Sequence, residues 1–234
     1  MFKITLENFY KRIIFMILFF ISVYLYRNYF KYNDRIDYID VDVSNNRNLV
    51  DIIKQHGTKK DPNLNFNKSS CRVLNFYDIS KNCPEYIDKF YDPSFIETIK
   101  KTIDLPNLEI ISPETDPLGF AMHLYCEDDF MEYHFDTNFT LGTRYSVVIP
   151  LYLNQENNCF LQIKDQEKKE KQVKIDIGKA VVYNGDKVLH CVTPQCKNGE
   201  RITLVLNLTT TTKTNFIGDI LQKIRNYMFK KYTW

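Results

Sequence analysis

The feature that most constrains the fold is a series of short runs of β-branched and aromatic residues between Gly119 and Thr210. Polar turn residues separate these runs, and no internal repeat is visible. Short runs at this spacing predict strands and favour a sandwich, a barrel or a jelly roll. We expect strands near residues 119–126, 131–137, 144–153, 159–164, 172–176, 179–184, 187–192 and 201–210.

Helical patterns flank the predicted strands. Residues 46–56 carry apolar side chains at helical spacing, and residues 93–103 repeat the pattern behind a proline at the first turn. Residues 215–231 form an apolar stripe with basic residues beside it. This last helix either covers the domain or lies on a membrane surface.

Residues 13–26 form an uncharged apolar run between Lys11-Arg12 and Arg27. As a helix the run spans roughly 21 Å, less than the roughly 30 Å of a hydrocarbon core, but the basic and aromatic flanks extend it. A cleaved signal peptide and a soluble helix are the alternatives. No small-x-small cleavage site surrounds Ser22, so we expect residues 1–27 to be a short tail and a single-pass transmembrane signal-anchor.

The anchor implies an order for the rest of the chain. Basic residues are balanced across the apolar run, so the positive-inside rule leaves the orientation open. The simplest arrangement places the following domain in the lumen of the endoplasmic reticulum or Golgi, or otherwise outside the cytoplasm. We expect a stalk and helix over residues 28–70, the main domain over 71–212 and a C-terminal amphipathic helix over 213–234.

The cysteines depend on that compartment. In an oxidising lumen two short-range disulfides could form, and Asn67 would be a credible glycan acceptor; in the cytosol all six cysteines would be free thiols. The two candidate pairs are Cys71 with Cys83 and Cys191 with Cys196.

Charge and hydropathy exclude several classes of protein. Lys and Arg number 31 and Asp and Glu number 29, which gives a net charge of +2. This balance argues against nucleic acid as a partner, because a binder needs a basic surface for the phosphates. The mean hydropathy of −0.35 excludes a polytopic membrane protein.

The chain has only four histidines, so few residues are candidates for a histidine-based metal site. Alternate residues of a strand face the same side, so His134 and Asp136 project together. His190 follows on a later predicted strand. Two histidines and one carboxylate on a β scaffold are the facial triad of non-haem Fe(II) oxygenases, although a pair of structural histidines would give the same pattern.

Arg201 adds a requirement for an anion. Strand alternation places Arg201 and Thr203 on one face, and a buried arginine is costly unless an anion meets it. A guanidinium beside a hydroxyl is well matched to a carboxylate. A dicarboxylate that reaches from the metal to Arg201 meets this requirement.

Together these motifs resemble the 2-oxoglutarate- and Fe(II)-dependent dioxygenases, particularly their prolyl and lysyl hydroxylase branch. The resemblance covers about residues 119–210. It rests on Tyr125 ahead of His134-Phe135-Asp136, on Tyr152-Leu153-Asn154, on Gly178-Lys179-Ala180, on His190-x-Val192-x-Pro194 and on Gly199-x-Arg201-x-Thr203.

The resemblance implies a mainly β fold with flanking helices (α+β), built on a double-stranded β-helix, or jelly-roll, core. It implies His134, Asp136 and His190 as the catalytic Fe(II) ligands and 2-oxoglutarate as the co-substrate, with ascorbate as a reductant for the iron. The residue implied for binding the distal carboxylate of 2-oxoglutarate is Arg201, with Thr203 or Tyr152 assisting. Tyr125 either contacts 2-oxoglutarate or the substrate, or only packs. His123 shares a face with Tyr125, so it either lines the substrate pocket or is a core histidine.

We therefore expect a membrane-anchored dioxygenase that hydroxylates a C–H bond, on Pro or Lys side chains of a protein or peptide. A dioxygenase for a small molecule or lipid and a non-catalytic jelly-roll binding module are the alternatives. The acidic run Glu127, Asp128 and Asp129 is most simply a solvated turn, and it could attract a basic substrate.

Overall fold

The computed structural model describes residues 33–63, 68–154 and 156–214, with residues 216, 218–220, 222, 223 and 226. The predicted anchor, Asn67 and most of the predicted C-terminal helix lie outside these residues. In the described part of the chain, no helix has the length and apolar character needed to cross a membrane.

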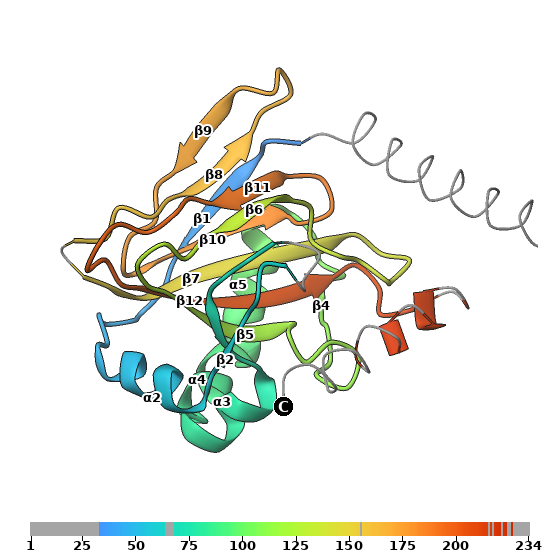
Figure 1. Ribbon diagram of the computed structural model, residues 1–234. Helices are drawn as coiled ribbons and strands as arrows, with labels where there is room; N and C mark the ends of the chain where they lie inside the picture. The colour runs from blue at the N-terminus through green and yellow to red at the C-terminus, as the bar shows by residue number, and fades with distance from the viewer. Residues whose placement is uncertain are drawn as a thin grey trace, which may run out of the picture.

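Two antiparallel sheets form the core (Figure 1). The major sheet has the order β1 (Ile36–Asp40), β10 (Lys179–Asn184), β7 (Arg144–Leu153), β12 (Arg201–Thr209), β5 (Phe120–Tyr125), β3 (Arg72–Leu74) and β2 (Thr58–Lys59), and β4 (Glu109–Ile110) also pairs with β12. The minor sheet has the order β6 (Met131–His134), β11 (Leu189–Val192), β8 (Leu161–Lys164) and β9 (Glu170–Val173). The mainly β, jelly-roll architecture expected from the sequence is confirmed.

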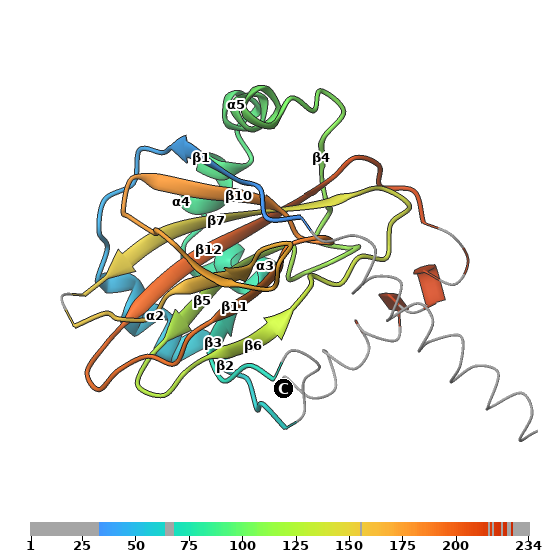
Figure 2. The ribbon, with the colours of Figure 1, turned by 90° about the horizontal axis from the view of Figure 1, so that it is seen from above.

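The helices cover the face of the major sheet that points away from the minor sheet (Figures 1 and 2). They are α2 (Asn48–His56), α3 (Phe76–Asn82), α4 (Glu85–Phe90) and α5 (Pro93–Ile103). Apolar residues at alternate positions of β12, from Ile202 to Leu208, join the buried cluster formed with these helices. The intervening positions, which include Arg201, Thr203 and Asn207, therefore face the minor sheet. We call this side of the major sheet the inner face.

The N-terminal part of the domain differs from the expectation. Residues 28–70 were expected to be a stalk and a helix, but β1 near their start pairs with β10 along residues 36–40 and forms an edge of the major sheet. The same range, expected to hold only a stalk and a helix, also includes β2, which pairs with β3. The helices over 46–56 and 93–103 are confirmed as α2 and α5, whereas α3 and α4 had no prediction.

Candidate metal centre and anion pocket

His134, Asp136 and His190 come together between the two sheets. Strand β6 ends on His134, and β11 places His190 directly opposite it in the antiparallel register. One ligand atom from each of the three residues lies within 4.8 Å of the other two. Oδ1 of Asp136 is 3.7 Å from Nε2 of His134 and 3.6 Å from Nε2 of His190. The three atoms are thus arranged around a common point.

Hydrogen bonds fix the tautomer of both histidines. Nδ1 of His134 is 2.8 Å from the carbonyl oxygen of Glu132, and Nδ1 of His190 is 3.0 Å from that of Val188. Because a carbonyl only accepts, each Nδ1 carries the proton and donates it. Each Nε2 is left with a lone pair directed at the common point. In metal-binding histidines, the ring nitrogen that does not bind the metal usually donates such a hydrogen bond.

Asp136 is held by a residue of the turn after β10 and by a residue of β7. Its backbone NH donates to the carbonyl of Gly185 at 2.9 Å, and Ser146 donates its hydroxyl proton to Oδ2. Ser146 Oγ also lies 2.9 Å from the side-chain oxygen assigned to Asn207. A hydroxyl has one proton to give, so this contact is satisfied if the Asn207 amide is turned to donate to Ser146. The result is a chain from Asn207 through Ser146 to Asp136 that leaves Oδ1 free for a metal.

Gly185 is required beside this carboxylate. A Cβ atom at position 185 would lie 2.5 Å from Oδ2 of Asp136 and 2.8 Å from Oγ of Ser146. Both distances are too short for a side chain, so a Cβ atom here would displace the carboxylate and the hydroxyl from their present positions.

The electrostatics favour the metal-binding protonation states. Burial opposes the charge of Asp136, but His190, His134 and Arg144 hold the pKa of that carboxyl well below its usual value. Burial, followed by the charge of His134, lowers the pKa of His190 to about 4. At neutral pH the site therefore offers a carboxylate and a neutral imidazole, as a divalent metal needs. Two nitrogen donors and one oxygen donor that leave other positions open fit Fe(II).

Arg201 lies on the inner face, and only 1% of it is exposed. One guanidinium nitrogen donates to the Cys159 carbonyl at 3.1 Å, and the guanidinium carbon is 5.3 Å from the centre of the Tyr125 ring. Nε has no hydrogen-bond partner, and no carboxylate among the described residues pairs with Arg201. A buried guanidinium without an anion is an unmatched charge, which is the state expected of an anion-binding site before its ligand binds.

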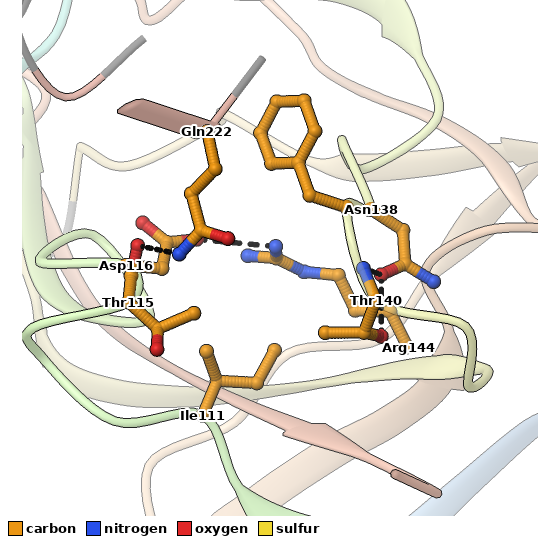
Figure 3. A pocket seen from close by; sticks show the side chains of 8 residues that line it. Ile111, Thr115, Asp116, Asn138, Thr140, Arg144 and Gln222 are labelled. Carbon is orange, nitrogen blue, oxygen red and sulfur yellow. Dashed lines mark hydrogen bonds and ion pairs between the residues drawn. The ribbon is translucent and has the colours of Figure 1, made fainter. Parts of the chain in front are cut away.

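Arg144 provides the contrast. It is also buried, but its guanidinium pairs with Asp116 at 3.1 Å and donates to the Thr137 carbonyl at 2.7 Å. Figure 3 shows Arg144 and Asp116 in a small pocket that Gln222 also lines, where Gln222 donates to the Thr115 carbonyl. The charge of Arg144 is already neutralised, so we assign this pocket no anion.

The other predicted co-substrate residues divide between the two faces. Tyr125 lies opposite Arg201, and Thr203 lies opposite His123, all on the inner face. Tyr152 does not join them. The register of β7 and β12 shifts between Ile202 and Thr203, so Tyr152 pairs with Ile202 and packs in the helix-side cluster. A β-bulge thus places Tyr152 on the opposite side from the expected one, and we remove it from the site.

The acidic turn also differs from its expectation. Asp129 is buried, accepts a hydrogen bond from the Cys126 backbone NH at 2.9 Å and pairs with Lys59. It is therefore a structural carboxylate. All six cysteines lie in the described part of the chain and none forms a disulfide.

Known structures share this fold, although no family model and no curated protein matches the sequence. A 2OG-Fe(II) oxygenase-family oxidoreductase from Burkholderia pseudomallei is 12% identical with a TM-score of 0.52, covering 72% of this chain and 80% of that one. The 2OG complex of a viral collagen prolyl hydroxylase from Paramecium Bursaria Chlorella virus-1 is 14% identical with a TM-score of 0.51, covering 76% and 96%. A non-heme alpha ketoglutarate dependent epimerase from nogalamycin biosynthesis is 8% identical with a TM-score of 0.53, covering 75% and 77%.

The fold and the site therefore define a class. The chain has the fold of the 2-oxoglutarate-dependent Fe(II) oxygenases, among them prolyl hydroxylases. On that fold it carries two histidines and one aspartate as a candidate metal centre.

Proposed function

We propose that this chain is an Fe(II)- and 2-oxoglutarate-dependent dioxygenase that hydroxylates a C–H bond. The observation that carries the proposal is the pairing of two features on one inner surface. A preformed three-ligand centre has its histidine tautomers fixed, and Arg201 is buried without a carboxylate partner. A dicarboxylate co-substrate requires both features.

Each residue has a defined task in this proposal. When bound, the metal and 2-oxoglutarate supply the oxidising chemistry, in which O₂ converts 2-oxoglutarate to succinate and CO₂ and one oxygen atom enters the substrate. His134, Asp136 and His190 hold the metal, and Ser146 orients Asp136. Arg201 binds the distal carboxylate of 2-oxoglutarate in a site from which water is largely excluded, and Tyr125 and Thr203 flank it.

For the substrate we propose a Pro or Lys side chain of a protein or peptide. The likeness of the fold to a viral collagen prolyl hydroxylase supports this choice. The similar likeness to a biosynthetic epimerase makes a small-molecule substrate the second candidate. The near-neutral charge of the chain counts against nucleic acid.

The test is succinate formation from 2-oxoglutarate by the full chain with Fe(II), ascorbate and O₂, first alone and then with Pro- and Lys-containing peptides. We expect basal turnover, stimulation by a subset of peptides and a peptide mass gain of one oxygen. Asp136→Ala should abolish turnover, whereas Asp51→Ala, an exposed position on α2, should not change it. Stimulation by small molecules alone would select the second candidate. A wild-type chain that binds neither Fe(II) nor 2-oxoglutarate would be a binding module.

We further propose that residues 13–26 anchor the enzyme in a membrane, with the domain in the endoplasmic reticulum or Golgi lumen or otherwise outside the cytoplasm. The support is the sequence of that run and its basic and aromatic flanks. The full chain should remain with membranes after alkaline carbonate extraction, and its domain should resist protease until the membrane is opened. Release by carbonate would contradict the anchor, and digestion in sealed vesicles would contradict the orientation.

A further inference from the structure

Lys60 ends a row of side chains that crosses the inner face from Arg201. Arg201 lies opposite Tyr125, and the register of β3 with β5 places Cys71 beyond Tyr125 in the same row. Tyr125 and Cys71 share a buried cluster. The backbone NH of Lys60 donates to the Cys71 carbonyl at 3.0 Å, so Lys60 follows as the last member of the row. Successive residues of an extended chain point to opposite faces. Lys59 forms an ion pair with Asp129 on the opposite face, so Lys60 points to the inner face.

His123 occupies the next row. It lies between Thr203 on β12 and Val73 on β3, and its ring is 6.3 Å from that of Tyr125, edge to face. The side chain is half-buried, and within the described residues neither ring nitrogen has a hydrogen-bond partner. Burial, followed by the charge of Lys60, holds the pKa of His123 well below its usual value. Arg201 and His134 lower this pKa further, and Asp136 partly opposes the shift. His123 thus lies among Lys60, Arg201 and the metal ligands as a neutral imidazole with an unused NH.

The charge of Lys60 is unmatched in the part of the chain that the structure describes. Lys60 is half-buried there, and no described carboxylate lies within ion-pair distance of it. Its neighbour Lys59 does have such a partner, Asp129, so the two adjacent lysines differ in this respect. A half-buried lysine without an acidic partner can pair with a ligand that brings the missing negative charge.

The co-substrate does not use this charge. On the proposed function, on which this inference rests, 2-oxoglutarate has one end at the metal and the other at Arg201. With a divalent metal, Arg201, Lys60 and Asp136 all charged, the dianionic co-substrate still leaves the pocket with one net positive charge. We propose that Lys60 and His123 bind a carboxylate of the substrate, carried by an acidic residue next to the side chain that is hydroxylated. The ammonium supplies the charge and the imidazole donates a hydrogen bond.

The test measures binding without turnover. The full chain in detergent micelles, loaded with Mn(II) and 2-oxoglutarate, is titrated into two fluorescein-labelled nine-residue peptides. Both peptides have a central Pro in a Gly/Ser sequence. In one peptide the Pro is flanked on both sides by Glu, and in the other it is flanked on both sides by Gln. We expect the Glu peptide to bind about tenfold more tightly, which corresponds to one charge-assisted contact. Lys60→Gln should reduce the preference to less than about twofold, Lys60→Arg should keep it, and His123→Leu should reduce it in part.

Lys101→Gln is the matched control, because it removes the same charge from an exposed position on α5, behind the helix-side face. Equal affinity of the wild-type chain for both peptides would overturn the proposal, as would an equal loss of affinity for both in Lys60→Gln or loss of the preference in Lys101→Gln. The two proposals fail separately. A chain that prefers Glu but never forms succinate would contradict only the dioxygenase function.

Discussion

At the residue scale, two buried arginines show how charge matching separates structure from function. The Nε atom of both arginines lacks a hydrogen-bond partner, but Arg144 has a carboxylate partner 3.1 Å away, whereas Arg201 has a carbonyl and an aromatic face. An ion pair stabilises only when both partners are present, and a lone buried charge costs free energy. The two residues should therefore respond in opposite ways to the same substitution.

Arg201→Met should raise the Kd for 2-oxoglutarate by about 30-fold or more, since truncating one partner of a buried hydrogen-bonded charge pair costs roughly 2–5 kcal/mol. The melting temperature of the ligand-free protein should not fall, because the substitution removes an unmatched charge. Arg144→Met should instead destabilise the fold by about 3–5 kcal/mol, since it removes the cationic partner of the buried Asp116 carboxylate. Calorimetry measures the Kd for 2-oxoglutarate, and thermal unfolding measures the melting temperature of both variants. A melting temperature that falls equally in both would show that Arg201 is structural.

Ser146→Ala should weaken metal binding by about 10- to 100-fold, because it removes the hydroxyl that orients the Asp136 carboxylate. The measurement is a titration with Mn(II), in which the electron paramagnetic resonance signal of free Mn(II) reports how much metal is bound. Ser80→Ala, at an exposed position of α3, should bind Mn(II) as the wild-type chain does. Unchanged affinity in Ser146→Ala would remove Ser146 from the site.

Strand alternation pairs His134 with Asp136 in the sequence, but it does not place His190 beside them, and the resemblance to the dioxygenases implied that the three residues are metal ligands. Alternation along β7 also predicts which face Ser146 points to. No nearby residue in the sequence indicates, however, that this strand passes next to Asp136. Gly185 is required by an approach from another strand, which spacing within its own turn does not reveal. Tyr152 was misplaced because a bulge at a register shift reverses the side that simple alternation predicts.

At the element scale, long strands with regular alternation were predictable and short polar ones were not. Strands β7 and β12 were found within a residue of their bounds. Strand β1, with the sequence IDYID, has its two acidic residues three positions apart, which breaks the alternation expected of a strand. It resembles a polar linker until β10 pairs with it. Helix α3 has seven residues and depends on an Asn75–Asp78 capping box, so its apolar pattern is too short to indicate a helix.

Strand β1 supplies the prediction at this scale. Ile39 is 4% exposed and belongs to the main buried cluster, so Ile39→Ala should lower the free energy of unfolding by about 2–4 kcal/mol. Tyr38 is 45% exposed on the other side of the same strand, and Tyr38→Ala should change it by less than about 0.5 kcal/mol. Urea unfolding measures both. If neither substitution changes stability, residues 36–40 are a stalk and not part of the sheet.

At the scale of the whole molecule, the candidate site depends on both sheets at once. The minor sheet supplies both histidines through β6 and β11, and the major sheet supplies Arg201 and Ser146 through β12 and β7. These segments are far apart in the sequence, so the site exists only when the jelly roll is complete. Ligands of the site should therefore stabilise the fold as a whole, because they bind the folded chain and not the unfolded one.

This dependence predicts an ordered response of the melting temperature. Mn(II) at about 100 times its Kd adds about 2.7 kcal/mol, which is roughly 5–10 °C for a domain of this size. 2-Oxoglutarate should add a further rise only when the metal is present, because one of its ends binds there. Asp136→Ala should lose both rises, and Arg201→Met should keep the first and lose the second. Differential scanning fluorimetry of the three proteins tests this order, and a 2-oxoglutarate rise that survives in Arg201→Met would place the co-substrate's distal carboxylate elsewhere in the jelly roll.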